Sequence, residues 1–361
     1  MSRALIYGFA AALFVVALHA QSPAVPPGES NHFIETPKGW TQPKTPWGDP
    51  DIQGMWPISY VGSVPLERCK GGGRTTTPVA ECDVNKAFWT EAEYRERVNA
   101  ASKRVDRHAE AIAKGDFGEA LQTGVTDPTA PQRQTSLIVD PPNGQLPGMT
   151  AEGKRLSALM KSSWALRGEE TQTWDTYLDF DSWDRCITRG MPSSMMPYRY
   201  NNGVRIIQTP GYVILDMEMV HETRIVPVDG RPPLSSKIKH WMGESRGRWE
   251  GNTLVIETTN FRTGPSATNI GVMGSPDGNR FPVSEQMKTT ERISRLNNDF
   301  LLYEIKTEDP IVLTRPWTAR YPLKLDPSYE WWEYGCHEGN RTIPDYINAS
   351  RAERAKQSEA K

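Results

Sequence analysis

From about residue 203 onward, the chain contains short runs in which apolar and polar residues alternate, separated by turn-forming residues. Alternation with a period of two predicts β-strands that bury one face. No long helical segment separates these runs, so consecutive strands are expected to pair antiparallel, with a hairpin turn at Asn297, Asn298 and Asp299. The predicted strands cover residues 204–208, 212–228, 253–259, 288–295, 300–307, 317–325 and 329–334.

Two helices are predicted in the first half of the chain. The first begins at Thr90, which forms a capping box with Glu93, and ends near residue 114, before Gly115. Its apolar residues recur with a helical period and form one stripe: Tyr94, Val98, Ala101, Val105, Ala109 and Ile112. Its charged face is interpreted as solvated. The second helix is expected over residues 150–167.

This pattern predicts a protein that is mainly β with an α-containing N-terminal half. For the C-terminal half it favours an antiparallel calycin-like (lipocalin-like) barrel, with a sandwich as the alternative. The expected divisions are a signal peptide (1–20), an extended leader (21–46), an N-terminal region with two helices (47–200), a barrel-like domain (201–350) and a polar tail (351–361).

The N-terminus has the pattern of a secretory signal peptide: Arg3 precedes an apolar run from Ala4 to Leu18, and polar residues follow. This run is shorter than the roughly 20 apolar residues that span a bilayer, and no other stretch approaches that length. We therefore expect a periplasmic or secreted protein without a stable membrane span. The 42 Lys and Arg against 44 Asp and Glu give a net charge of −2, which argues against a nucleic-acid partner.

The four cysteines are expected to form disulfides, because an even number in an exported chain favours bridges over metal or catalytic thiols. Four cysteines allow three pairings. Cys69 and Cys82 flank a short Gly- and Thr-rich loop, and this proximity favours a local bridge, which leaves Cys186 to pair with Cys336.

Five motifs are distinctive: W-G-D-P-D at 47–51, I-V-D-P-P at 138–142, Q-T-P-G-Y at 208–212, R-G-R-W-E-G-N-T-L at 246–254 and Y-G-C-H-E-G-N at 334–340. Together they resemble a large family of uncharacterised secreted bacterial proteins. The resemblance extends over nearly the whole mature chain and implies export and a one-piece fold. It implies no activity, cofactor or catalytic residue.

His221 is the first candidate functional residue. Within the strand predicted over 212–228, alternation places it on the same face as Met217 and Met219, which become candidate ligand contacts. An imidazole among apolar side chains can act as an acid, a base or a hydrogen-bond donor to a ligand. The alternative is a buried histidine that bonds a backbone carbonyl.

The second candidate is the charged, Trp-containing segment 240–251, which is expected to be rich in turns and to line a barrel mouth. Glu244 is a candidate general base, and Arg246 is counted with it among the candidate catalytic residues. Arg246 and Arg248 could hold a carboxylate or phosphate through forked donors, and Trp241 could stack on an aromatic ligand. A salt-bridged hairpin that closes the barrel end is an equally good interpretation.

The histidines lack the spacing of a recurrent metal-ligand pair, and no Walker or dinucleotide glycine pattern occurs, so no metal or cofactor is expected. The resulting hypothesis is an exported protein that encloses a small apolar or aromatic molecule. It would be either a cofactor-free lyase, isomerase or hydrolase that uses His221, or a non-catalytic ligand-binding or envelope-interaction protein. The sequence leaves the oligomeric state open.

Overall fold

The computed structural model describes residues 33–70, 82–116, 131–161, 163, 173–198, 200–264 and 281–359. The predicted signal peptide 1–20 and the first part of the leader lie outside these residues. Residues 33–46 have no regular structure, but they contact the body of the protein: the Trp40 indole donates to Asn298, and Gln42 is buried. None of the helices in the described ranges is long and apolar enough to cross a membrane.

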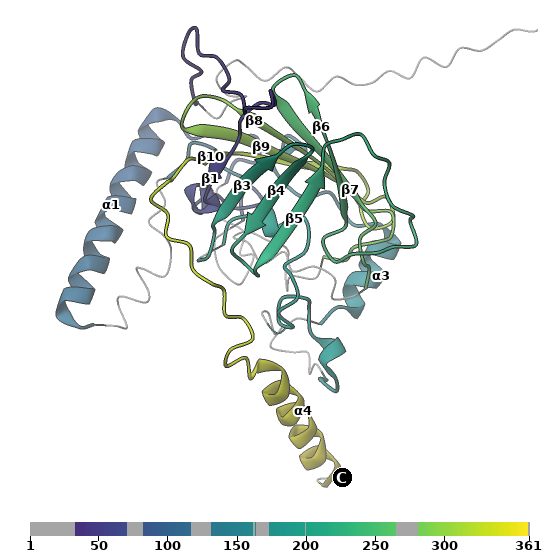
Figure 1. The fold of residues 1–361 in the computed structure, drawn as a ribbon. Coiled ribbons are helices and arrows are strands. Elements are labelled where there is room, and N and C mark those ends of the chain that lie inside the picture. The colour runs from purple at the N-terminus through teal and green to yellow at the C-terminus, as the bar shows by residue number, and fades with distance from the viewer. Residues whose placement is uncertain are drawn as a thin grey trace, which may run out of the picture.

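Two antiparallel sheets form the body of the protein (Figure 1). The four-stranded sheet has the order β1-β3-β4-β5, with β1 at Gly54–Met55, β3 at Val204–Thr209, β4 at Tyr212–Met217 and β5 at Glu222–Pro227. The six-stranded sheet has the order β2-β10-β9-β8-β7-β6. Its strands are β2 (Ile138–Asp140), β6 (Glu244–Glu250), β7 (Thr253–Thr259), β8 (Lys288–Arg295), β9 (Phe300–Glu308) and β10 (Trp317–Lys324). The N-terminal region thus supplies one edge strand to each sheet.

One hydrophobic core lies between the two sheets. Leu215 of β4 and Val226 of β5 share it with Ile256 of β7, Tyr303 of β9 and Trp317 of β10, all of which are fully buried. The prediction of a mainly β protein with antiparallel strands is confirmed. Among the described strands, no hydrogen-bonded pair joins the two sheets, so these strands do not close a barrel. The calycin-like assignment stays a prediction.

The prediction of one continuous strand over 212–228 is wrong, because this segment forms two strands, β4 and β5, joined by a turn. His221 N donates to Glu218 O (2.8 Å) and closes the turn. The turn shifts the alternation by one residue: odd positions point inward in β4, whereas Arg224 and Val226 point inward in β5 and Ile225 is 61% exposed. Buried Arg224 donates two hydrogen bonds of 2.6 and 3.0 Å to Glu291, which is also buried.

The first predicted helix is confirmed, the second is shorter than predicted, and a further helix forms near the C-terminus. Helix α1 (Glu91–Lys114) has the predicted capping box between Thr90 and Glu93, and Gly115 ends it with a φ of +68°. Helix α3 (Ala151–Leu159) stops earlier than predicted, because the backbone of Met160 is extended. Residues 351–359 of the predicted polar tail (351–361) belong to helix α4 (Thr342–Glu359), which projects from the sheets in Figure 1. Three short 3-10 helices cover Ile58–Val61, Tyr177–Asp179 and Ser193–Met195.

Both predicted disulfides are present. Cys69 is bonded to Cys82, 13 residues away, and Cys186 to Cys336, 150 residues away. The long bridge joins the segment between β2 and β3 to the segment after β10. The short bridge holds the segment before α1, next to the candidate site described below. The predicted strand at 329–334 is irregular chain.

Candidate functional site

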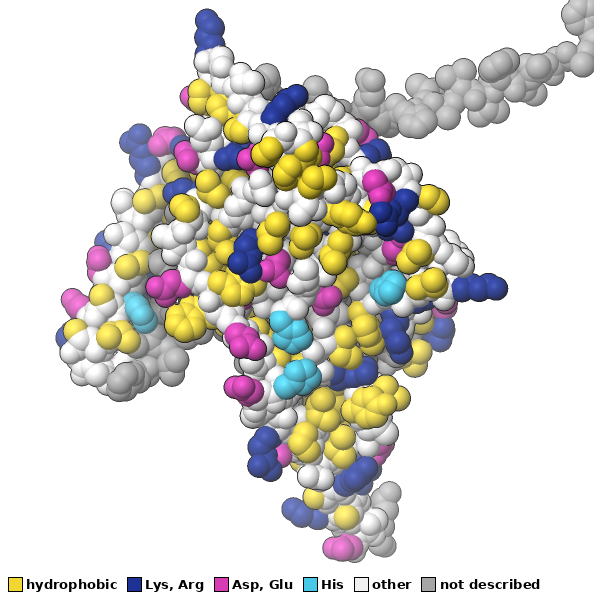
Figure 2. All heavy atoms as spheres, viewed as in Figure 1, with side chains coloured by type: hydrophobic (Ala, Val, Ile, Leu, Met, Phe, Trp, Pro, Cys, Tyr) yellow, Lys and Arg dark blue, Asp and Glu magenta, His cyan; other side chains and the backbone are white. Residues whose placement is uncertain are grey.

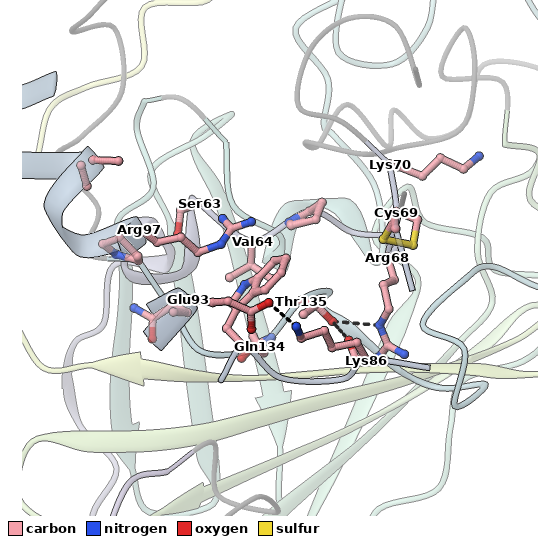
Figure 3. Close-up of a pocket in the computed structure, with 18 of the residues that line it drawn as sticks. Ser63, Val64, Arg68, Cys69, Lys70, Lys86, Glu93, Arg97, Gln134 and Thr135 are labelled. Atoms are coloured by element: carbon pink, nitrogen blue, oxygen red, sulfur yellow. Dashed lines mark hydrogen bonds and ion pairs between the residues drawn. A yellow bond between two sulfur atoms is a disulfide. The ribbon is translucent and has the colours of Figure 1, made fainter. Parts of the chain in front are cut away.

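A cleft of about 740 Å³ lies between helix α1 and the segment that ends at the short disulfide (Figure 3). Figure 3 shows Glu93 and Arg97 on the α1 side, and Arg68, Cys69 and Lys70 on the opposite side. The remaining wall consists of residues from three segments, 62–65, 82–89 and 131–135. We call this hollow the α1 cleft.

Helical periodicity places one face of α1 along the cleft. The lining residues of this helix are three or four positions apart, so their side chains share a face. Ala100 and Ala101, in the middle of this face, carry short side chains that leave room for a ligand. The full set from α1 is Glu93, Arg97, Ala100, Ala101, Arg104 and Arg107.

The α1 cleft has an excess of positive charge. Its two carboxylates are Asp83 and Glu93. Glu93 pairs with Lys86 and also bonds Thr90, and these contacts lower its pKa to about 2. This carboxylate is therefore ionised at neutral pH, and its charge is offset by Lys86. The cations that line the cleft are Arg68, Lys70, Lys86, Arg97, Arg104 and Arg107.

Arg68 is the most buried of these cations, with 3% of its surface exposed. Its guanidinium donates to Thr135 Oγ1 (2.8 Å) and to the carbonyl oxygens of Val84 (2.6 Å) and Pro142 (2.9 Å). Burial lowers the pKa of Arg68, but arginine stays protonated at physiological pH. All these acceptors are neutral, and the nearby Asp83 carboxylate interacts electrostatically with the Arg68 charge.

Trp89 and Arg97 form a stacked pair at the α1 side. The Arg97 guanidinium carbon is 3.7 Å from the centroid of the Trp89 ring, and Lys86 Nζ is 5.5 Å from it. Stacking occupies the face of a guanidinium and leaves its N–H edge available for a carboxylate or phosphate. Burial lowers the pKa of Arg97, which remains a cation. Among the described residues, Arg104 and Arg107 form no ion pair.

The lining is dominated by positively charged hydrogen-bond donors. Among the described residues that line the cleft there is no histidine, and Cys69 and Cys82 are bonded to each other. The lining offers several positively charged donors around one hollow, an arrangement that recognises anions.

The predicted catalytic histidine lies on the turn between β4 and β5. His221 has a φ of +57° and an exposed side chain, so it does not share the buried face of Met217 as predicted. Its ring stacks on His337, with the ring centroids 6.3 Å apart. Within the described ranges, no hydrogen bond or ion pair connects His221 with Glu244 or Arg246.

The segment 240–251 forms a strand where turns were predicted. Its residues 244–250 are strand β6, which pairs with β7 through a tight turn at Gly251. Glu244 and Arg246 lie together and form an ion pair, and both Glu244 carboxylate oxygens accept from Leu234 N (2.9 and 3.0 Å). Arg248 is on the outside, paired with Glu250 and Glu257.

The candidate ligand contacts are likewise distributed over several places. Met217 is 1% exposed and lies in the main core, whereas Met219 packs with Trp183 in a separate small cluster. Trp241 is partly buried, and the guanidinium carbons of Arg262 and Arg185 lie 4.7 and 5.8 Å from its centroid. The structure therefore does not gather these residues around one described hollow.

Our sequence reasoning missed the α1 cleft, although a signal was present. Arg97, Arg104 and Arg107 are seven and three residues apart, which places them on one helical face. The expectation of a merely solvated charged face is therefore incomplete, because these arginines line the cleft. The opposing wall could not be anticipated, because it requires the segments around Arg68 and Gln134 to fold next to the helix.

No protein-family model, curated protein or solved structure matches this chain. The resemblance to secreted bacterial proteins therefore stays a prediction. In the part of the chain that the structure describes, no three His, Cys, Asp or Glu side chains are grouped as metal ligands.

Proposed function

We propose that this protein is an exported binding protein for a small anionic molecule, which it holds in the α1 cleft. The observation that carries the proposal is the charge of the lining: six cationic side chains and two carboxylates surround one hollow of about 740 Å³. A volume of this size is typical of small-molecule sites. Two disulfides are compatible with an extracellular location.

Rigid support for the cations favours binding over a merely solvated surface. Arg68 is held by three neutral acceptors, and Arg97 is stacked on Trp89. Side chains that are already ordered lose little conformational entropy when a ligand arrives. The ligand chemistry thus differs from our sequence-based hypothesis, since charge is the main recognition element and an apolar or aromatic part is secondary.

The binding hypothesis has better support than acid–base catalysis at His221, Glu244 and Arg246. A general base needs to reach the proton that it abstracts. Glu244 is occupied by Arg246 and by Leu234 N, while His221 lies on an exposed turn. A catalytic role for these three residues stays a hypothesis, because none of them lines the α1 cleft.

The test is isothermal titration calorimetry with phenyl phosphate, inorganic phosphate and benzylamine. We expect both phosphates to bind and the cationic benzylamine not to bind. The variant Arg97→Gln/Arg104→Gln/Arg107→Gln should weaken phosphate binding at least about tenfold. Losing even one charge-assisted hydrogen bond costs about 1.5–3 kcal/mol, and about 1.4 kcal/mol is a factor of ten.

A matched control is available on the same helix. Arg95→Gln/Lys103→Gln/Lys114→Gln removes three positive charges from exposed positions of α1 that do not line the cleft. This control should bind phenyl phosphate like the wild type. If both triple variants weakened phosphate binding equally, the loss would come from the change in net charge alone, and the proposal would be wrong. It would also be wrong if neither phosphate bound the wild-type protein.

A further inference from the structure

Helix α1 carries a second feature beside its arginines. Val98, Val105 and Ile112 are 39%, 48% and 52% exposed, although they belong to the apolar stripe of the helix. They are seven residues apart, so the row extends about 21 Å at a rise of about 1.5 Å per residue. Figure 2 shows hydrophobic side chains among charged ones on the visible face of this helix.

The stripe borders the α1 cleft. Each residue of an α-helix is rotated by about 100° from the one before it, so Ile112, Val105 and Val98 lie about 20°, 40° and 60° from Ala101 around the axis. Ala101 itself lines the cleft. Arg97 and Arg104 lie about 40° and 60° from Ala101 in the opposite direction. A row of exposed apolar side chains therefore runs parallel to a row of arginines, with Ala101 between them.

We propose that the ligand of the α1 cleft is an anionic amphiphile with a single long alkyl chain. This inference rests on the proposed function and specifies its ligand. The anionic head would bind among Arg97, Arg104 and Arg107, and the chain would cover Val98, Val105 and Ile112. A small polar anion would leave the apolar row in water, and a neutral hydrocarbon would leave the arginines without a partner.

A second copy of the chain is the other conceivable occupant, and the charges disfavour it. In a helix pair that buries the row at 98, 105 and 112, the flanking positions are 95, 102 and 109 on one side and 97, 104 and 111 on the other. These positions carry Arg95, Arg97 and Arg104 and no carboxylate. Two copies would thus lack opposite charges across the interface, whereas an anionic amphiphile complements both rows.

The experiment is calorimetric titration of the full mature chain with hexanoate, dodecanoate and dodecyltrimethylammonium, all below micelle formation. Dodecanoate should bind at least about tenfold more tightly than hexanoate, because six more methylenes leave water. The cationic amphiphile should bind much more weakly than dodecanoate. Equal affinity of hexanoate and dodecanoate, or equal affinity of the two twelve-carbon probes, would overturn the inference.

Variants separate the stripe from the cleft. Val105→Ser/Ile112→Ser should reduce dodecanoate affinity to the level of hexanoate and leave phenyl phosphate binding unchanged. The control Ala92→Ser/Ala113→Ser makes similar changes at exposed positions of α1 outside the stripe and should have no effect on either probe. If dodecanoate affinity survives the stripe variant, or if that variant converts a dimer into a monomer on light scattering, the inference is wrong.

The two proposals fail in different ways. If phenyl phosphate binds the wild type and alkyl chain length has no effect, only the amphiphile inference is overturned. If phenyl phosphate does not bind, the proposed function is wrong, and the inference that depends on it is overturned as well.

Discussion

At the scale of single residues, Glu93 has three roles. Its carboxylate caps the start of α1 through Thr90, pairs with Lys86 and lines the α1 cleft. The sequence predicted the first role from the spacing of a capping box. The other two depend on Lys86 and on the opposite wall, which come close to Glu93 only in the folded chain.

We predict a specific pH dependence for Glu93→Gln. The folded pKa of about 2 lies below the ordinary value of 4.5, so this carboxylate stabilises the fold above about pH 4.5, and its contribution declines as the pH falls towards 2. Glutamine keeps the capping box, so the substitution removes mainly the charge. The variant should melt below the wild type at pH 7, and the difference should shrink between pH 4.5 and 2. Thermal melts across this range measure it, and a constant difference would contradict the prediction.

At the scale of elements, alternation of apolar and polar residues predicts the bounds of some strands correctly but misses a turn within another. The strands predicted at 253–259 and 288–295 are β7 and β8 with the predicted bounds, and the alternation of β10 matches its buried residues. The segment 212–228 differs because alternation alone does not show a turn that lacks Gly, Pro or Asn. The turn is held by Glu218, whose carboxylate accepts from Gly203 N, Tyr329 and Trp332 N, and these partners are distant in sequence.

The shifted alternation of β5 is testable with neighbouring substitutions. Ile225 is 61% exposed and Val226 is fully buried. Ile225→Asp should therefore change the free energy of unfolding by no more than about 0.5 kcal/mol. Val226→Asp places a carboxylate in the core between the sheets and should prevent stable folding. Urea denaturation of both variants measures their free energies of unfolding. If Ile225→Asp destabilised the protein more than Val226→Asp, the shifted alternation of β5 would be wrong.

At the scale of the whole molecule, the two disulfides join parts that the sheets alone do not connect. The pairing followed from cysteine number and proximity in the sequence, and both bridges are present. The spatial relations that they secure could not be predicted. One bridge lies in the wall of the α1 cleft, and the other joins the segment after β10 to Cys186. Such relations depend on tertiary packing and not on local pattern.

The two bridges should differ in their contribution to stability. In the loop-entropy model, closing a loop of 150 residues stabilises by about 5 kcal/mol and closing one of 13 residues by about 3 kcal/mol. Cys186→Ser/Cys336→Ser should thus lower the melting temperature more than Cys69→Ser/Cys82→Ser does. Calorimetry of both double variants under identical conditions checks the order. A larger loss from the short bridge would show that native contacts, not chain entropy, dominate.

The position of the short bridge also bears on when the protein becomes competent to bind. Cys69 and Cys82 are themselves part of the cleft wall, and Arg68 precedes the bridge directly. A chain with free thiols at these positions would lack this covalent link between the two segments of the cleft wall. Under the proposed function, we therefore expect formation of this disulfide to come before ligand binding.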